Sequence, residues 1–178
     1  MTLSFSQKIN DAATFFPEKI LSGLRGMELT QEMANYLSQS SSHSKPLSFR
    51  PKLHTIREDT KDRWKVGAKI HMVINNRTKD RLQFAPVLEV KAIQKIKIWR
   101  SVEGNSTKVC VFIDDKLLGV ATFLDGYLLS YSKSLLELAY NDGFDYLSPD
   151  PAPWDLGFFN WFSEDFEGKI IHWTDLKY

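Results

Sequence analysis

Hydrophobic and polar residues alternate most regularly between residues 88 and 99. One set of alternate positions is apolar and comprises Leu88, Val90, Ala92, Ile96 and Ile98. The other set is polar or basic apart from one aromatic residue, and comprises Glu89, Lys91, Lys95, Lys97 and Trp99. Because successive side chains of a strand point to opposite sides, this period of two predicts a long strand with one buried face and one basic, solvent-facing face.

Shorter runs predict further strands in the same way. The segment "KIHMVIN" alternates from residue 69 onward, and "TKVCVFI" and "KLLGVATF" are typical of two strands joined by a tight turn at Asp114-Asp115. Gly104-Asn105 marks another turn, and "GKIIHWTDLKY" is the expected closing strand.

Helical periodicity precedes these strands. Phe16, Ile20 and Leu24 recur at every fourth position of "FFPEKILSGLRG", with Pro17 suited to the first turn and Gly26 to the end of a helix. A second short helix is expected in "LTQEMANYL", with Thr30 as its N-cap and an apolar stripe of Met33, Tyr36 and Leu37. The polar stretch "SQSSSHSKP" that follows is expected to be a loop rather than a domain boundary.

Two more helices are expected late in the chain. "SKSLLELAYNDGF" predicts a helix that starts near Ser132 or Ser134 and ends at Gly143. "DPAPWDLGFFNWF" begins with prolines and then becomes helical, and its aromatic residues share one side and are expected in the core: Trp154, Phe158, Trp161 and Phe162.

Strands of mixed length with helices at the ends and between them predict an α+β fold. A small, mostly antiparallel β-barrel with flanking helices fits best, because no regular helices separate the strands as a doubly wound parallel sheet requires. At 178 residues the chain is expected to be a single domain, residues 1–178, with a helical insertion at about residues 27–50.

Composition narrows the class of protein. The 43% apolar and 13% aromatic residues suffice for a buried core. No window has the roughly 18 to 20 apolar residues that span a bilayer, and the N-terminus lacks the pattern of a signal peptide, so a cytoplasmic protein without a membrane partner is expected. The single cysteine, Cys110, excludes an internal disulfide and is expected to be a buried, inert thiol.

Charge is distributed unevenly along the chain. Residues 45–100 hold 15 Lys and Arg against 5 Asp and Glu, whereas residues 101–178 hold 5 against 13. The basic segment favours an anionic partner such as nucleic acid or a nucleotide. The alternative is that the two segments pack together and neutralise each other, and the sequence leaves both open.

The sequence contains no phosphate-binding glycine loop, no nucleophile elbow and no paired-histidine metal motif. There is no G-x-x-x-x-G-K-[ST], G-x-G-x-x-G or G-x-S-x-G, and His43, His54, His71 and His172 do not form H-x-x-x-H. No cofactor and no metal site is therefore expected, and His71 and His172 are expected to be hydrogen-bonded residues of the sheet.

One stretch combines side chains that suit a ligand site. Lys52, Thr55 and Arg57 are spaced K-x-x-T-x-R. Arginine offers a planar fork to phosphate or a base edge, and a lysine in an apolar pocket can lose its proton and act as a base toward the threonine hydroxyl. In an extended chain Lys52 and His54 share one face, and a bend would let Lys52 join Thr55 and Arg57. The competing interpretation is that Arg57 pairs on the surface with one of its acidic neighbours: Glu58, Asp59 or Asp62.

The order of these motifs resembles the ASCH domain family of the PUA-like superfamily. The resemblance rests on "FFPEKILSG", then Lys52-x-x-Thr55-x-Arg57, then "WKVGAKI", and on the later "LLELAYNDGF" with an aromatic helix and a closing strand. It departs from compact members of the family in the insertion before the motif and in a longer sheet region around "QKIKIWRSVEGNSTK".

The resemblance implies a PUA-like barrel whose cleft binds RNA or a modified nucleoside or nucleotide. Some small members are amidohydrolases that remove an acyl group from acetylated cytidine with a lysine, a threonine and a glutamate. The first two carry over to Lys52 and Thr55. The glutamate's place falls on Asp142, whose side chain is one methylene shorter, with Glu137 as the fallback.

Three functions remain open. Binding of RNA or a nucleoside through Lys52, Thr55 and Arg57 is the leading hypothesis, with further ligand contacts expected from Trp64, Lys95, Lys97 and Trp99. Trp64 is also a natural core residue. The alternatives are an amidohydrolase that uses Lys52, Thr55 and Asp142 as catalytic residues, and a non-enzymatic scaffold protein that uses the insertion as its partner surface.

Overall fold

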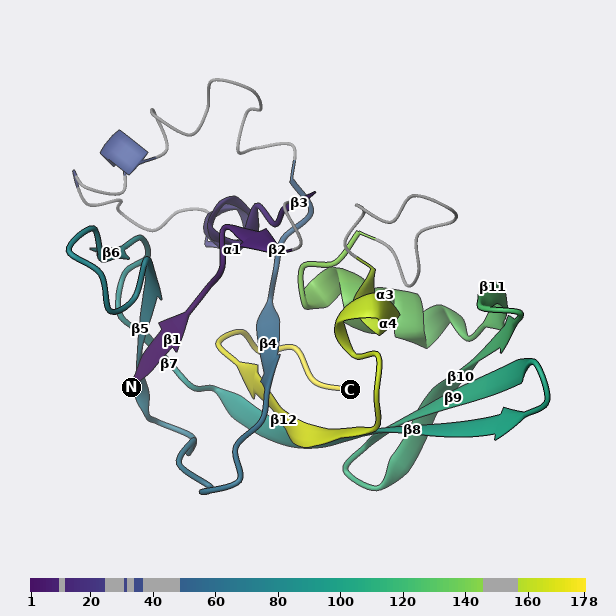
Figure 1. The fold of residues 1–178 in the computed structure, drawn as a ribbon. Coiled ribbons are helices and arrows are strands. Elements are labelled where there is room, and N and C mark those ends of the chain that lie inside the picture. The colour runs from purple at the N-terminus through teal and green to yellow at the C-terminus, as the bar shows by residue number, and fades with distance from the viewer. Residues whose placement is uncertain (10–11, 25–30, 32–33, 37–48, 146–156) are drawn as a thin grey trace.

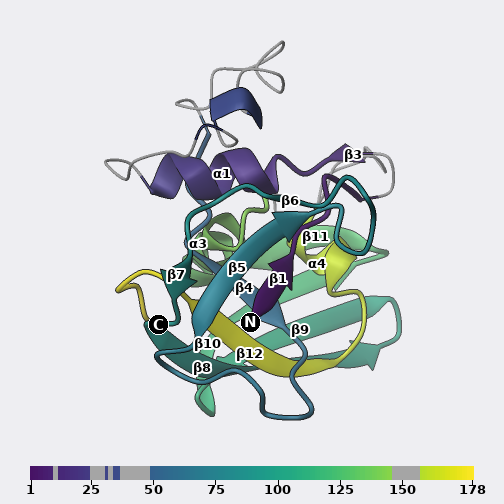
Figure 2. The same cartoon turned by 90° about the vertical axis from the view of Figure 1, so that its left-hand side faces the viewer.

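The computed structural model describes residues 1–9, 12–24, 31, 34–36, 49–145 and 157–178. These residues form a mixed α+β fold in which most neighbouring strands run antiparallel, as expected (Figure 1). The largest sheet has the strand order β11-β10-β9-β8-β12-β4 and curls into a half-barrel (Figures 1 and 2). Its strands are β4 (His54–Arg57), β8 (Ala92–Glu103), β9 (Ser106–Ile113), β10 (Lys116–Leu124), β11 (Tyr127–Tyr131) and β12 (Phe166–His172).

A second, smaller sheet lies beside the β4 end of the half-barrel (Figure 1). In it β1 (Thr2–Ser4) runs parallel to β5 (Lys69–Ile74), and β5 also pairs antiparallel with β6 (Leu82–Gln83) and β7 (Leu88–Glu89). A two-stranded ribbon joins β2 (Lys8–Ile9) to β3 (Ala12–Ala13). The strand pattern did not predict β1, which has only three residues.

The structure confirms the predicted buried and exposed faces of residues 88–99, but these residues form two strands instead of one. Leu88–Glu89 belongs to β7 and pairs with β5, and the chain then enters β8 and the half-barrel. Within β8, buried Ala92, Ile96 and Ile98 face the core and alternate with exposed lysines and Trp99. A strand passing between two sheets keeps its period of two, so the pattern alone does not show where it changes partner.

Tight turns set the hairpins of the half-barrel. Asp114 and Asp115 both have positive φ, 48° and 64°, and join β9 to β10 as predicted. Asp125 and Gly126 make a similar turn, with φ of 51° and 84°, and lead into β11. The Asp-Gly pair is a strong hairpin signal, and it was the available clue to β11, which the strand pattern missed.

The helices are α1 (Phe16–Gly23), α3 (Lys133–Asn141) and α4 (Phe158–Trp161). Helices α3 and α4 lie on the concave side of the half-barrel, and α1 lies near the start of β4 (Figure 1). Helix α1 ends before Gly26, which lies outside the described residues, and β12 ends at His172 rather than continuing to Tyr178. Gly143, with φ of 87°, follows the end of α3 as predicted.

Two other predicted segments lie partly or wholly outside the described residues. Of the second helix, Gln31 and residues 34–36 are helical, whereas Thr30, Met33 and Leu37 are not described. The polar connector at residues 38–46 and Trp154 are also outside the described part of the chain.

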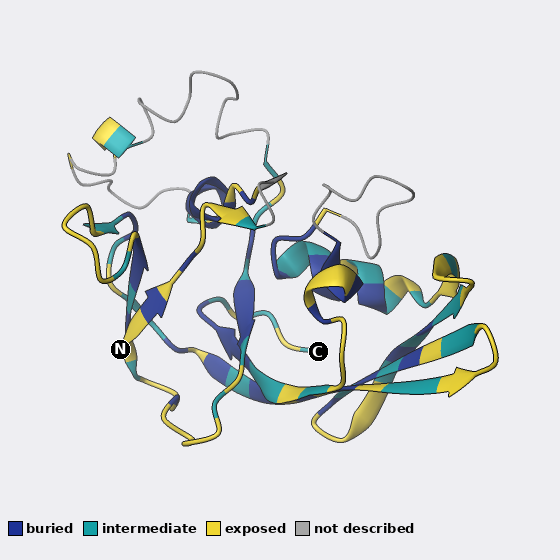
Figure 3. Ribbon diagram, viewed as in Figure 1, coloured by how far each residue is buried: buried dark blue, intermediate teal, exposed yellow. Residues whose placement is uncertain are grey.

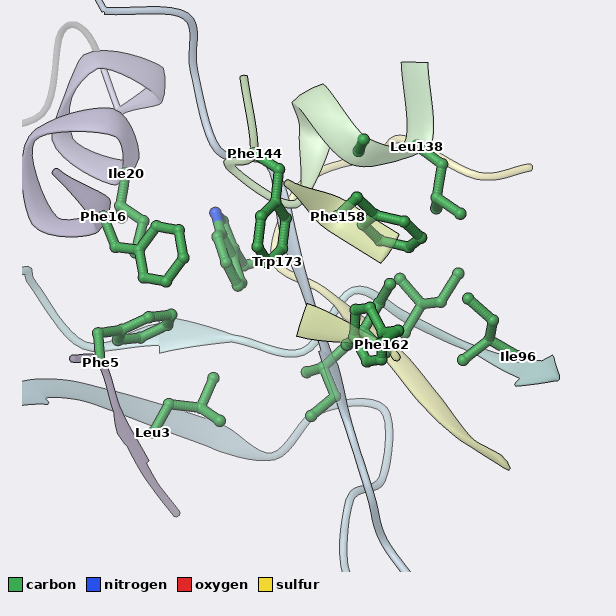
Figure 4. Packing of buried hydrophobic residues seen from close by; sticks show 14 of the residues in the cluster. Leu3, Phe5, Phe16, Ile20, Ile96, Leu138, Phe144, Phe158, Phe162 and Trp173 are labelled. Carbon is green, nitrogen blue, oxygen red and sulfur yellow. The ribbon is translucent and has the colours of Figure 1, made fainter. Parts of the chain in front are cut away.

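The core fills the space between the sheets and the helices (Figures 3 and 4). Phe158 and Phe162 are buried as predicted, but Trp161 is 47% exposed. Because α4 has only one turn and its buried phenylalanines face the sheet, Trp161 turns to solvent. Cys110 is half-buried rather than buried, because it lies opposite exposed Trp99 in the β8–β9 pair. None of the described helices is both long enough and apolar enough to cross a bilayer.

Candidate functional site

The start of the Lys-Thr-Arg motif is held between two helices. The backbone N–H of Lys52 donates to the carbonyl oxygen of Lys19 in α1 at 3.0 Å, and the N–H of Leu53 donates to Asn141 O at the end of α3 at 2.8 Å. Strand β4 follows as the edge strand of the half-barrel and pairs with β12. The motif therefore lies where α1, α3 and the sheet meet.

Lys52 is 2% exposed and pairs with Asp142, which is also buried. Its Nζ lies 2.7 Å from Asp142 Oδ1 and also donates to the main-chain carbonyl oxygen of Asp142. The same carboxylate oxygen accepts the N–H of Ile56 at 3.2 Å. The structure thus brings together Lys52 and Asp142, two of the predicted site residues.

A second buried lysine binds the same helix end. Lys19 Nζ donates to Gly143 O and to Asp145 Oδ2, both at 2.8 Å. Carbonyl groups at a helix C-terminus lack partners within the helix and carry partial negative charge, so two lysines stabilise them directly. Lys52 therefore has a structural role at α3 whatever it binds in addition.

Burial and the ion pair have opposite effects on the Lys52 ammonium. Removal from water disfavours its charged form and lowers its pKa to about 8, although Asp142 acts to raise it. Burial likewise raises the pKa of Asp142, which Lys52 and Arg57 act to lower. Burial thus favours the neutral amine of Lys52, and the ion pair with Asp142 favours its charged form.

Arg57 does not form the predicted surface pair with an acidic neighbour. Among the described residues its guanidinium has no ion pair, and Asp59 and Asp62 instead accept Lys169. Arg57 Nη2 donates to Ser4 O at 3.0 Å, and its Cζ lies 5.4 Å from the centre of the Phe5 ring. Its Nε is buried and has no hydrogen-bond partner in the described part of the chain.

Aromatic rings connect the two cations. Lys52 Nζ lies 4.8 Å from the centre of the Phe16 ring, and Phe16 packs edge-to-face on Phe5 at 6.5 Å. Trp173 packs on Phe5 at 6.4 Å, and its indole Nε1 is also buried without a partner among the described residues (Figure 4). Lys52 and Arg57 thus face one aromatic cluster, defined here as Phe5, Phe16 and Trp173.

Thr55 lies inside the protein on β4, two residues before Arg57. Its side chain is 3% exposed and has no hydrogen bond among the described residues. Thr55 pairs in register with Ile171 and Arg57 pairs with Lys169, so the two side chains share one face of β4. Lys52 and His54 both contact Asp142, which agrees with the predicted alternation.

The other predicted ligand residues lie apart from Lys52. Lys95, Lys97 and Trp99 are exposed on β8, and Lys97 pairs with Glu167 at 2.6 Å. A hollow of about 250 Å³ beside Lys95 and Lys97 is lined by Phe112 but also by acidic Asp115. Trp64 is buried in the core, and Glu137 is exposed on α3, 3.9 Å from Lys133.

The unequal charge of the sequence is partly balanced in space. Strand β12, from the acidic segment, pairs with β8, from the basic segment. Glu167 neutralises Lys97, and the backbone N–H of Arg100 donates to Asp165 Oδ1 at 2.8 Å. Packing of the two segments against each other therefore accounts for part of the charge pattern.

Two histidines, His54 and His172, are buried close to the Lys-Thr-Arg motif, which their spacing in the sequence did not predict. His54 is fully buried, and its Nε2 lies 2.7 Å from the Tyr178 hydroxyl. His71 is hydrogen-bonded to Gln83 as expected. His172 is not: both of its ring nitrogens are buried without a partner among the described residues. The only available signal was that His54 lies within the motif.

No group of three metal-ligating side chains occurs among the described residues. A scan of the chain against models of protein families gives no match, and searches of curated proteins and of solved structures give none either.

Proposed function

We propose that the protein binds a nucleoside, a nucleotide or RNA at a site formed by Lys52, Thr55 and Arg57. The main support for this proposal is that Arg57 lacks partners for its charge and for its Nε donor among the described residues. Arg57 is a half-buried cation with no carboxylate partner among the described residues, and its buried Nε donor is unsatisfied. A buried donor without an acceptor costs about 1–3 kcal/mol, which a phosphate or carbonyl oxygen of a ligand would recover.

The surroundings of Arg57 favour a heteroaromatic ligand over a simple anion. The rings of the aromatic cluster are only 2–8% exposed, so a base would stack on them only after they move apart, and Trp173 Nε1 adds a second unsatisfied donor. Nucleobases present a π-face for stacking and carbonyl oxygens that accept from N–H groups. Lys52 and Thr55 are only 2% and 3% exposed, so a ligand would reach them only after the side chains that cover them move. One base or sugar requires a smaller movement than the backbone of a duplex.

A PUA-like barrel of the ASCH type is part of the same proposal. The curled sheet and the Lys52, Thr55 and Arg57 motif at its edge support it. Lys95, Lys97 and Trp99 are proposed to contact longer RNA from the convex face of β8, since their side chains are exposed.

Binding of nucleosides, mononucleotides and short single-stranded RNA at low salt tests the proposal. Arg57→Met should weaken binding about ten-fold or more, because an ionic hydrogen bond is lost. Arg63→Met is the matched control, since Arg63 is 64% exposed and lies outside the cluster. For RNA alone, Lys95→Ala and Lys97→Ala should make the salt dependence shallower. Absence of binding to every one of these ligands at low salt would exclude the function.

A second candidate is an amidohydrolase acting on an acylated nucleoside, and the Lys52–Asp142 pair specifically favours it. For this reaction Lys52, whose pKa burial lowers to about 8, would first lose its proton to solvent and turn from Asp142 toward Thr55. Its neutral amine would then take the proton of the Thr55 hydroxyl, which attacks the acyl carbonyl. The acyl group passes to Thr55 Oγ1 as its bond to the nucleoside nitrogen breaks, the nucleoside amine leaves with the proton that Lys52 took from Thr55, and water then releases the acid.

Incubation with acetylated cytidine, followed by chromatography for cytidine, tests this activity. Thr55→Ala should abolish turnover, and Thr60→Ala, a change at an exposed threonine of the next loop, should leave it intact. Turnover that survives Thr55→Ala would refute the mechanism while leaving the activity established.

A further inference from the structure

Tyr178 connects three elements around the site. Its backbone N–H donates to Gln94 Oε1 and its carbonyl oxygen accepts Gln94 Nε2, both at 2.9 Å, which fixes it to β8. Its hydroxyl lies 2.7 Å from His54 Nε2 in β4 and 2.9 Å from Asn141 Nδ2 at the end of α3. The hydroxyl is therefore held by two residues next to the Lys52–Asp142 pair, because His54 Nδ1 lies 3.7 Å from Asp142 Oδ1 and Asn141 directly precedes Asp142.

The donors and acceptors of this network fix the direction of its hydrogen bonds. An amide nitrogen only donates, so Asn141 Nδ2 donates to the Tyr178 oxygen. The phenolic hydrogen then needs an acceptor, and His54 Nε2 is at hydrogen-bond distance. His54 is neutral, because burial, together with Lys52 and His172, lowers its pKa well below the usual value. Its one ring proton must then be on Nδ1.

The Nδ1 proton of His54 lies near the Asp142 carboxylate, which already accepts a hydrogen bond from Lys52. His54 Nδ1 is buried without a hydrogen bond among the described residues, and Asp142 Oδ1 lies 3.7 Å from it. That separation exceeds a hydrogen bond by about 0.7 Å. Lys52 Nζ occupies the same oxygen at 2.7 Å. If Lys52 turned to a ligand or lost its proton, Asp142 would lose its main charged donor.

We propose that Tyr178 and His54 are positioning residues of the site. The Tyr178 hydroxyl keeps the His54 proton on Nδ1. When Lys52 binds a ligand, this Nδ1–H donates to Asp142 in its place, and we call it the reserve donor. A small shift of the His54 ring toward Asp142 completes the replacement. The functional half of this inference rests on the proposed ligand binding, whereas the proton position is a property of the free protein.

The ¹⁵N chemical shifts of the imidazole nitrogens test the proton position without any ligand. In the wild-type protein His54 should show a protonated Nδ1 and an unprotonated Nε2. Tyr178→Phe removes only the hydroxyl and should give a mixture of tautomers, and Asn141→Ala, which frees a lone pair on the Tyr178 oxygen, should shift the same equilibrium. His71, in the smaller sheet, is the internal control and should not change. A His54 proton on Nε2, or a tautomer insensitive to both variants, would overturn the inference.

Ligand titration tests the reserve donor. With the nucleoside that binds best, Tyr178→Phe should raise the Kd about ten-fold, and Tyr131→Phe, at an exposed tyrosine of β11, should leave it unchanged. When the ligand binds, the ¹H NMR resonance of the His54 Nδ1 proton should shift downfield, as expected for a hydrogen bond to a carboxylate. An unchanged Kd in Tyr178→Phe would refute the reserve donor while the proposed function stands; a tautomer as expected in a protein that binds no nucleoside would refute the function instead.

Discussion

Lys52 donates to Asp142 twice, once to the carboxylate oxygen Oδ1 at 2.7 Å and once to the main-chain carbonyl oxygen just after α3. One lysine thus neutralises a buried acid and also satisfies a helix terminus. A residue with both tasks is costly to change, and its functional and structural roles must be separated by experiment.

Replacement of Lys52 is expected to destabilise the fold strongly. Lys52→Met leaves the Asp142 carboxylate buried without its charged partner, and a broken buried pair costs about 3–5 kcal/mol. Urea unfolding at pH 7 measures the loss. Lys65→Met, in an exposed pair with Asp62, should cost less than about 1 kcal/mol. The double variant Lys52→Met/Asp142→Leu should lose less than the sum of its single changes. Equal losses of unfolding free energy in Lys52→Met and Lys65→Met would show that the buried pair stabilises the protein no more than an exposed pair does.

Gly143 should tolerate no side chain, for two separable reasons. Its φ of 87° is unfavourable for other residues, and an added Cβ would lie 2.9 Å from Lys52 Cδ. Gly126 has nearly the same backbone angle, 84°, with open space around it. Gly126→Ala should therefore cost about 1–2 kcal/mol from the backbone alone, and Gly143→Ala clearly more, as measured by urea unfolding. Similar losses would mean that Lys52 moves aside freely.

Local signals in the sequence predicted the fold better than the site. Asp114-Asp115, the alternation in β8 and Gly143 each act within a few residues, so their effects are visible without the rest of the chain. The contacts of Arg57 with Ser4 and of His54 with Tyr178 join segments far apart in sequence. No periodicity records such contacts, so the residues around Arg57 by themselves favour a surface ion pair that the structure does not contain.

Asp142 is a candidate only through the resemblance to the ASCH family, for which the comparisons give no match. Nothing in its spacing links it to Lys52, which is 90 residues away. The resemblance pointed to it, and the structure places its carboxylate on the lysine. The Lys52–Asp142 pair does not by itself identify a ligand, because Lys52 also binds the main-chain carbonyl oxygen that follows α3.

The loop after β4 should depend on Asp59. Its buried carboxylate accepts the N–H groups of Arg63 and Trp64 and the Nζ of Lys169, each at 3.0 Å. Burial acts to raise its pKa, but these hydrogen bonds, with that of Trp64 the largest, lower it to about 2. Asp59→Asn should cost about 1–3 kcal/mol at pH 7. Because the folded-state pKa is depressed, the wild-type advantage should be constant above about pH 4 and disappear toward pH 2. An advantage that persists at pH 2 would contradict this account.

The two buried histidines of the half-barrel predict a loss of stability in mild acid. Burial, together with the charge of Lys177, lowers the pKa of His172 to about 4, although Asp114 acts to raise it; burial, Lys52 and His172 also lower that of His54. Below about pH 6.5 the unfolded chain takes up protons that the folded protein does not, so the free energy of unfolding must fall with pH. Each histidine contributes about 1.4 kcal/mol per pH unit until its own folded-state pKa is reached. Urea unfolding at pH 7, 6 and 5 measures the slope, and His172→Leu should reduce it by about half. A slope that is unchanged in His172→Leu would show that this imidazole is already protonated, or accessible to protons, in the folded protein.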